Sequence, residues 1–596
     1  MREYFEAEMR VLQEAAAEFS RAYPDQARML DMTELRDRDP YIERLLEGMA
    51  FLTARIRQEI HDSRAAVSEQ LLAHVCPNQL MPFPSTTVMA FAPAAHGGTP
   101  QYLPAGAEIK SRPVPAAEVS DPGDGGTGVG EARQEGETGA RVIRCVFRTA
   151  ADTWVQGLAV RAASASEVSG TRSVIRLEFE CIGGALAADL SLAHLPLYLH
   201  ADQSLALALY LALCNGVVTV QVRGEDGLDT VIGGQDCLRG MHLEPENALL
   251  PVTDRSHPGF SLLQEYFCCR DKFLFVELVG LDRVSWPDGC RRFAVEITCD
   301  ETLPAEHKLS ADNIRLHCVP AVNLFATQSE PVNVDHRRSE YRIVADRRFP
   351  GSVVIHGVDA LQSRAFGTGE TQRYEPLYNL TQGSPEKAYY DVIRRDIGTG
   401  FAQVYVTLGG PRTDHASLSC DITAGHGHLP RRFLHERQIT ECGKGMPADL
   451  KPENITRPSA ALPPPRREDY AWRLHALLSL NVGSMARAST LRALLSLFDW
   501  SGRRDNARRI EGIAEVAAWP VNRIVQGILY RGLEIEITVT EDRFVSPGDI
   551  YLFGQVIHRF FALSAAVNEF IATRLVCLPS QREYSWFPRL GRSSPI

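Results

Sequence analysis

Four residues in one short stretch carry side chains that bind metal ions, namely Cys420, Asp421, His426 and His428. Zinc accepts thiolate, carboxylate and imidazole ligands, and two histidines separated by one residue on a strand project to the same side. Structural zinc sites usually draw on two paired ligand clusters, however, and the sequence contains no C-x-x-C pair. Glycines and a proline interrupt the stretch, which favours a turn with ordinary polar histidines. A metal-dependent enzyme of the cell envelope, with Cys420, His426 and His428 around the metal, is therefore the less favoured hypothesis.

Residues 123–130 are rich in glycine, as phosphate-binding loops are. Such a loop also needs a buried strand before it, a helix after it and usually a Gly-Lys-Ser/Thr ending, because backbone N–H groups at the helix start hold the phosphate. The surrounding run 113–140 is instead rich in Pro, Gly, Glu and Asp, which predicts a solvated, disordered loop between strands. The sequence also lacks the G-x-S-x-G and H-E-x-x-H motifs of hydrolases. We therefore expect no enzymatic activity, no cofactor and no metal.

The composition narrows the class of protein. The 596 residues are 44% hydrophobic and 23% charged, which is typical of globular proteins, and this length corresponds to about four domains. A formal net charge of -11 argues against binding to nucleic acid or to anionic lipid. The most apolar run, residues 205–214, is shorter than the ~18 residues that span a bilayer. We expect no direct membrane insertion.

Two further features of the sequence indicate the compartment. The N-terminal run MREYFEAEMR is charged and lacks the apolar core of a secretory signal. The 13 cysteines show no spacing typical of a disulfide framework, and Cys268 and Cys269 are adjacent. We therefore expect a cytoplasmic protein whose thiols are reduced and mostly buried as small hydrophobic side chains.

The elements that would position these side chains begin with helices in residues 1–85. An apolar stripe at steps of three and four predicts a first helix that ends near Pro24. Asp39 and Pro40 supply a cap and a first-turn proline for a second, long amphipathic helix. A third, short helical segment is predicted at 66–75, before a cluster of prolines.

The N-terminal helices carry more apolar surface than separate helices can bury alone, so they must pack together or against a partner. The alternative is that these stripes form only the core of their own domain, as helical stripes usually do. We interpret the helices as an interaction module. The partner-interface candidates are the large apolar residues of the first two stripes: Phe5, Met9, Leu12, Phe19, Leu45, Met49, Leu52 and Ile56.

We predict an α+β multidomain fold, with residues 1–85 as its helical segment. Short runs rich in β-branched and aromatic residues, separated by Gly, Pro, Asp and Asn, predict β-rich domains at 86–300 and 301–442. Six prolines indicate an extended connector at 443–466, which is also the candidate hinge. Residues 467–596 are predicted to form a C-terminal α+β domain.

The C-terminal domain shows a clear order of elements. Two leucine-rich helices, WRLHALLSL and STLRALLSLFDW, precede two strands, RIVQGILY and RGLEIEITV, with Gly532 at the predicted turn between the strands. A last long helix begins after residues 547–549, and its apolar stripe continues through Val567 and Ile571.

Several blocks of the sequence carry a family likeness. The segment DPYIERLLEGMAFLTARI, followed by LLAHVCPNQLMPFPS, resembles the opening of the TssF family, the type VI secretion baseplate subunits also called VasA or ImpG. The likeness continues in order through LLQEYFCCRDKFLFVEL, EPVNVDHRRSEYRIVAD, RGLEIEITVTEDRF and YLFGQVIHRFFALSAAVNEF. It covers the chain essentially from end to end, and ordered similarity of many blocks is far more specific than any single motif.

The resemblance implies a non-enzymatic scaffold of the type VI secretion baseplate, a contractile injection machine. It implies a wedge complex of two TssF copies with one TssG, six wedges around the VgrG hub, and contacts to TssK, to TssE and to sheath proteins. It also implies a cytoplasmic location, docked through the baseplate at the inner-membrane complex. In this interpretation the eight interface candidates pack in a bundle shared with the second copy and TssG. A wedge protein of a phage tail or tailocin baseplate is the alternative.

Overall fold

The computed structural model describes residues 2–29, 40–93, 99–116, 141–168, 172–224, 227–251, 255–303, 308–367, 369–377, 387–395, 400–411, 416–447, 449–465, 470–478, 480–525 and 528–591. The chain forms two compact units. The first contains Met1–Val75 with Arg466–Ala476, and the second contains Cys76–Pro465 with Leu477–Ile596. Long helices make up the first unit and several β-sheets dominate the second, so the predicted α+β class is confirmed.

The first unit is helical because its apolar residues recur with helical spacing and its prolines lie at helix ends. Its helices are α1 (Arg2–Ala22), α2 (Pro24–Met29), α3 (Pro40–Val75) and most of α7 (Tyr470–Leu478). Pro24 and Pro40 each occupy a first helical position, where a missing N–H costs nothing. The predicted end of the first helix and the start of the second at Pro40 are confirmed, and the predicted cap Asp39 lies outside the described residues. The predicted separate helix at 66–75 is wrong, because residues 61–66 contain neither Gly nor Pro and α3 continues through them.

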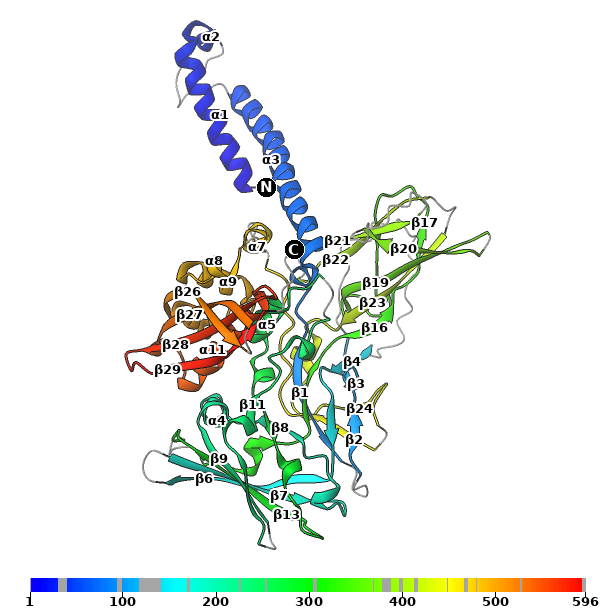
Figure 1. Cartoon of the computed structure of the whole chain (residues 1–596). Coiled ribbons are helices and arrows are strands. Elements are labelled where there is room, and N and C mark those ends of the chain that lie inside the picture. Colours follow the sequence, from blue (N-terminus) through cyan, green and yellow to red (C-terminus); the bar gives the residue numbers. More distant parts are fainter. Residues whose placement is uncertain are drawn as a thin grey trace. The chain divides into compact units, whose positions relative to one another are not determined.

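Helices α1 and α3 pack side by side (Figure 1). Small side chains are buried on both helices, Ala16 on α1 and Ala50 and Ala54 on α3. Alanine at such positions lets two helix backbones approach closely. An ion pair between Arg57 and Glu8 links the same two helices.

The second unit contains a six-stranded and a five-stranded sheet within its described residues. The first has the order β24-β3-β4-β15-β1-β25 and consists of β1 (Thr86–Ala92), β3 (Glu108–Pro115), β4 (Val142–Thr149), β15 (Cys318–Val322), β24 (Ile439–Cys442) and β25 (Lys451–Asn454). The second has the order β10-β9-β13-β7-β6 and consists of β6 (Leu158–Val168), β7 (Arg172–Cys181), β9 (Val217–Gly224), β10 (Asp229–Gly233) and β13 (Arg292–Cys299). Every second residue of β7 is buried, as period-2 alternation predicts.

Three smaller groups of strands and one large sheet complete the unit. A four-stranded sheet contains β8 (His194–Leu199), β11 (Leu238–Gly240), β12 (Phe275–Val279) and β14 (Ile314–Arg315), and a pair contains β2 (Gln101–Leu103) and β5 (Thr153–Val155). The eight-stranded sheet contains β16 (Phe325–Gln328), β17 (Val332–Val334), β18 (Tyr341–Arg342), β19 (Val354–Ala365), β20 (Thr371–Pro376), β21 (Tyr389–Arg395), β22 (Gln403–Gly409) and β23 (Ala416–Gly425). The C-terminal sheet has the order β26 (Ile513–Val525), β27 (Ile528–Thr540), β28 (Glu569–Leu578) and β29 (Glu583–Leu590).

The helices described in the second unit are α4 (Gln203–Asn215), α5 (Pro258–Cys268), α6 (Leu429–Phe433), α8 (Val482–Met485), α9 (Ala488–Phe498), α10 (Arg504–Glu511) and α11 (Pro547–Ser564). Contacts of α11 with α4 and α5, and of α9 with α5, join the C-terminal part of the second unit to its middle. The parallel strands β27 and β28 are connected through α11, as parallel pairing requires a crossover. Helix α11 packs against α4 and α5, with hydrogen bonds from Tyr210 Oη to Gln555 Oε1 (2.6 Å) and from Tyr551 Oη to the Cys214 carbonyl (3.0 Å). The finer division of the chain at residues 85, 300, 442 and 466 remains a prediction.

The segment predicted as a connector and hinge, 443–466, is not free in the structure. Strand β25 pairs antiparallel with β1 at the edge of the six-stranded sheet, where Pro452 is tolerated. Phe83 and Leu462 exchange two backbone hydrogen bonds of 2.8 Å. The described part of this segment is therefore tied to β1 and to Phe83, and its role as a hinge between two copies stays a prediction. In the predicted loop 113–140, β3 continues to Pro115, and residues 117–140 lie outside the described residues.

Two predictions for the C-terminal part are also wrong. Gly532 lies within β27, opposite Val521 and Phe570, and the link between β26 and β27 falls at residues 526–527, outside the described residues. Helix α11 ends at Ser564, so Val567 is exposed beyond it and Ile571 belongs to β28. No helix among the described residues is long and apolar enough to cross a membrane.

The position of Gly532 leads to a stability prediction. A Cβ atom there would lie 2.3 Å from the Phe570 carbonyl oxygen, a backbone atom that cannot move aside. We expect Gly532→Ala to lower the free energy of unfolding by about 1–3 kcal/mol, as overpacked positions do. Urea denaturation measures the change. Gly367→Ala is the matched control, because a Cβ at Gly367 meets nothing within 4 Å; equal stability of the two variants would contradict the prediction.

Candidate interaction surface

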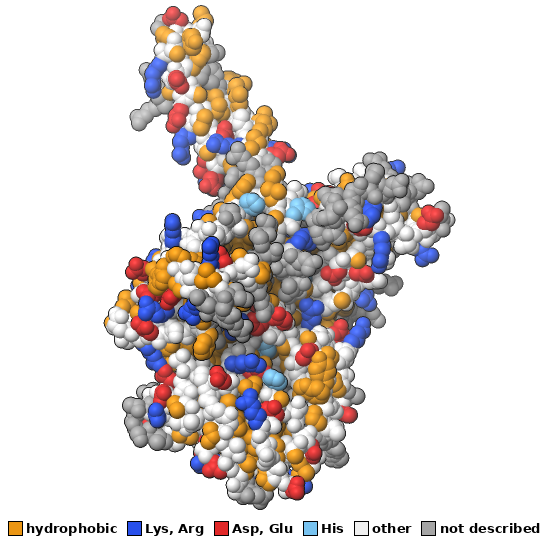
Figure 2. All heavy atoms as spheres, viewed as in Figure 1, with side chains coloured by type: hydrophobic (Ala, Val, Ile, Leu, Met, Phe, Trp, Pro, Cys, Tyr) orange, Lys and Arg blue, Asp and Glu red, His pale blue; other side chains and the backbone are white. Residues whose placement is uncertain are grey.

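The long helix α3 presents large apolar side chains to solvent. Leu45, Leu52 and Ile56 are 70%, 62% and 57% exposed, and Met49 and Ile60 are also exposed. Their spacing of three or four residues places these five on one side of the helix. We call Leu45, Met49, Leu52, Ile56 and Ile60 the outward α3 stripe. Figure 2 shows hydrophobic side chains along the α1–α3 hairpin, interspersed with charged ones.

The same helix buries small residues on its other side. At about 100° per residue, Ala50 and Ala54 lie roughly opposite the outward α3 stripe. Both are fully buried, and α1 packs along α3. Helix α3 therefore has two apolar faces: one with small residues that packs within the hairpin, and one with large residues that is exposed.

The eight interface candidates divide between the two kinds of surface. On α1, Phe5, Met9, Leu12 and Phe19 are half-buried around the buried Ala16, so their stripe contributes to packing within the hairpin. The four candidates on α3 belong to the outward stripe. Which of the eight contact a partner chain stays a prediction.

The residues considered for a metal site do not converge. Cys420 and Asp421 are consecutive on β23, so their side chains point to opposite faces; the Cys420 side chain is buried, whereas Asp421 accepts a hydrogen bond from Gln328 Nε2 at 3.2 Å. The His428 ring packs on Phe401, with centroids 4.6 Å apart. Within the described ranges, no three His, Cys, Asp or Glu residues are placed to hold a metal ion.

His426 has a structural role in the core. Its backbone N–H donates to Asn323 Oδ1 (2.7 Å), and its Nδ1 lies 3.0 Å from Asn323 Nδ2, which can donate to a neutral ring. Its ring also packs against Phe325. Burial lowers the pKa of His426 to about 3, so the imidazole is neutral near pH 7.

The cysteines behave as the sequence predicts. All are free, and all except Cys269 and Cys442 are buried. Burial raises the pKa of Cys145 to about 12 and that of Cys76 to about 11, which keeps both thiols protonated. Their packing role as small hydrophobic side chains is confirmed.

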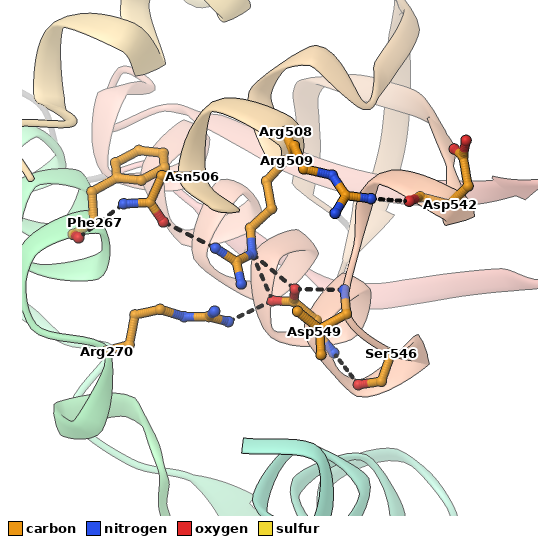
Figure 3. Close-up of polar contacts among 9 residues, drawn as sticks. Phe267, Arg270, Asn506, Arg508, Arg509, Asp542, Ser546 and Asp549 are labelled. Atoms are coloured by element: carbon orange, nitrogen blue, oxygen red, sulfur yellow. Dashed lines mark hydrogen bonds and ion pairs between the residues drawn. The ribbon is translucent and has the colours of Figure 1, made fainter. Parts of the chain in front are cut away.

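The sequence did not reveal a buried ionic cluster at the start of α11 (Figure 3). Asp549 is completely buried and accepts hydrogen bonds from Arg509 Nε (2.8 and 3.0 Å), from Arg270 and from the Val545 backbone N–H (3.2 Å). Arg509 Nη1 also donates to Asn506 Oδ1 at 3.0 Å. The cluster connects α10 and α11 with the segment that follows α5.

A local sequence signal for Asp549 was present, but its partners lie far away. Ser546 caps α11 and Asp549 stands three residues later, a pattern close to a capping box. Arg270, in contrast, is 279 positions from Asp549, and no periodicity relates the two. Asn506 extends the connection, because its Nδ2 donates to the Phe267 carbonyl at the end of α5 (3.1 Å).

Removal of the buried carboxylate should be costly. Asp549→Ala leaves two buried guanidinium groups without their counter-charge, and we expect a loss of about 3–5 kcal/mol in the free energy of unfolding. Chemical denaturation of the purified chain measures this loss. Asp542→Ala, at an exposed aspartate of the same region, is the control. Similar stability of the two variants would rule out a structural role for the cluster.

The buried histidine predicts a pH dependence of stability. The folded chain keeps His426 neutral, whereas the unfolded chain protonates it below about pH 6.5, so the unfolded state binds the extra proton. The stabilisation is complete above pH 6.5 and is lost as the pH falls toward 3, at up to about 1.4 kcal/mol per pH unit. We expect His426→Gln to reduce the slope of unfolding free energy against pH between 6.5 and 4 by at most the contribution of one proton, because burial also lowers the pKa of other histidines, which keep their contributions. His435→Gln, at an exposed histidine, should leave the curve unchanged; a wild-type slope in His426→Gln would contradict the assignment.

Comparison with known proteins connects this architecture to one family. The family model described as "Type VI secretion system, TssF" matches residues 1–593. The type VI secretion system component TssF1 of Pseudomonas aeruginosa is 29% identical, with 96% of each chain covered. A chain of the cryo-electron microscopy structure of the TssK-TssF-TssG baseplate subcomplex is similar with a TM-score of 0.77 and 29% identity, covering 93% of this chain and 100% of that one.

A second solved structure agrees with the first. A chain of the baseplate complex from the type VI secretion system has a TM-score of 0.63 and 27% identity, and the similarity covers 100% of both chains. The sequence and structural similarities therefore extend over nearly the whole chain. With a family model that matches almost every residue, the chain belongs to the TssF family of the type VI secretion system.

Proposed function

We propose that the chain is a structural subunit of a type VI secretion baseplate, where it forms a wedge with TssG and a second copy of itself and contacts TssK. Family membership supports this proposal, as does the similarity to chains of the TssK-TssF-TssG subcomplex and of the baseplate complex. The matching family model is that of type VI secretion, which favours this machine over a phage tail or tailocin.

The observation that carries the proposal is the outward α3 stripe. Each large apolar side chain contributes roughly 1.5–3 kcal/mol when it moves from water into a packed interior. Five such side chains in helical register on one exposed face form the surface that a helix of a partner chain can cover. We assign this surface to the bundle shared with TssG and the second copy.

The proposed role is that of a scaffold rather than an enzyme. The residues considered for a metal site make structural hydrogen bonds with different partners. The Cys420 backbone N–H donates to Ser329 Oγ (3.0 Å), and the His426 ring is hydrogen-bonded to Asn323. The wider assembly belongs to the same proposal. It includes the VgrG hub, TssE and the sheath on one side and the inner-membrane complex, reached through TssK, on the other.

Leu52→Asp tests the assigned surface. Because Leu52 is exposed in the chain alone, we expect the variant to fold with wild-type helicity and thermal stability. In the complex the new carboxylate would be buried without a partner charge, which costs several kcal/mol and should abolish recovery of TssG. Co-purification of coexpressed, tagged chains measures that recovery.

The control introduces the same charge elsewhere on the hairpin. Ala7 is exposed on α1, on the side away from the stripe of Phe5 and Met9, so Ala7→Asp should recover TssG at the wild-type level. Wild-type recovery of TssG by Leu52→Asp would reject the placement of the interface on the outward α3 stripe. Loss of folding in Leu52→Asp would contradict the exposure of this residue.

A further inference from the structure

The cluster at Asp549 holds two positive charges against one carboxylate oxygen. Arg270 Nη2 and Arg509 Nε both donate to Asp549 Oδ1, so the two guanidinium groups are neighbours (Figure 3). Asp549 and Arg509 are buried, and the Arg270 side chain is only 13% exposed. Like charges repel strongly away from water, and one carboxylate cannot neutralise two cations.

Three donors of this cluster have no partner within the described residues. Arg270 Nη1, Arg509 Nη2 and Tyr266 Oη are all buried and make no hydrogen bond there. The Arg270 guanidinium lies over the Tyr266 ring, 5.4 Å from its centroid, and the charges of Arg270, Asp549 and Arg509 all act on the Tyr266 hydroxyl. Burial raises the pKa of Tyr266, so this hydroxyl keeps its proton and can donate.

The surrounding charges do not satisfy these donors. Asp271 is the other carboxylate whose charge reaches Arg270, but Arg503 acts on it more strongly. Guanidinium groups are donors only and keep their charge in proteins. The site therefore suits a ligand that accepts several hydrogen bonds and carries negative charge, and it suits water less well, because water must also donate.

We propose that Arg270 Nη1, Arg509 Nη2 and Tyr266 Oη bind a small monovalent inorganic anion of the chloride class. The anion accepts the three unpaired donors and reduces the repulsion between the two guanidinium groups. It thereby stabilises the connection between α10, α11 and the segment after α5. This site is independent of the outward α3 stripe and of the baseplate assignment.

Thermal unfolding in chloride tests the proposal. Sodium chloride is titrated against sodium gluconate at constant ionic strength, and we expect the Tm of the full chain to rise and saturate with chloride. Tyr266→Phe keeps both ion pairs of Asp549 and removes one donor, so we expect the chloride concentration at half-saturation to rise about tenfold. Arg270→Gln should abolish the chloride effect. Arg292→Gln, at an exposed ion pair with Glu180, should respond as wild type.

Bromide provides a direct readout that does not depend on any variant. In crystals of the full chain grown with bromide, we expect an anomalous peak within about 3.5 Å of the three donors. A water molecule without anomalous signal at this position would overturn the proposal. So would the lack of a saturable chloride effect in the wild type, or an unchanged effect in Tyr266→Phe. If Arg270→Gln fails to fold, Tyr266→Phe and the bromide peak decide the outcome.

Discussion

A carboxylate removed from water must be neutralised by groups that the fold brings to it, and Asp549 imposes this constraint on the second unit. Its two arginines come from widely separated parts of the sequence, Arg270 after α5 and Arg509 in α10. The start of α11 is therefore tied both to α10 and to the segment after α5. Helix α11 also packs against α4 and α5, and removal of one partner from the ionic cluster would leave an uncompensated buried charge beside that packing.

The first unit follows a different principle. Alanine side chains on α1 and α3 bring two helices close together, and the large residues of the outward α3 stripe are left on the opposite side. A chain selected only for its own stability would bury the large residues of the outward α3 stripe in preference to Ala50 and Ala54. The reverse distribution is understandable if the hairpin is one half of a larger packed structure.

Features with a local cause could be predicted from the sequence. The three-and-four spacing from Phe5 to Phe19 and the proline at position 40 identified α1 and the start of α3, because helix periodicity and proline geometry act over a few residues. The turn predicted at Gly532 was wrong. Glycine often marks a turn, but here the missing side chain makes room for the Phe570 backbone. The partners of Asp549 could not be predicted, because only the tertiary fold brings Arg270 and Arg509 together.

The pairing of β25 with β1 has a consequence for synthesis of the chain. The Ser85 hydroxyl, next to β1, donates to the carbonyl of Ser459, which is translated 374 positions later. At a translation rate of about 5–20 residues per second, roughly 20 to 75 seconds pass between the synthesis of β1 and that of its partner strand β25. During this interval an apolar strand has an open hydrogen-bonding edge, so nascent chains on one messenger are susceptible to strand exchange with each other.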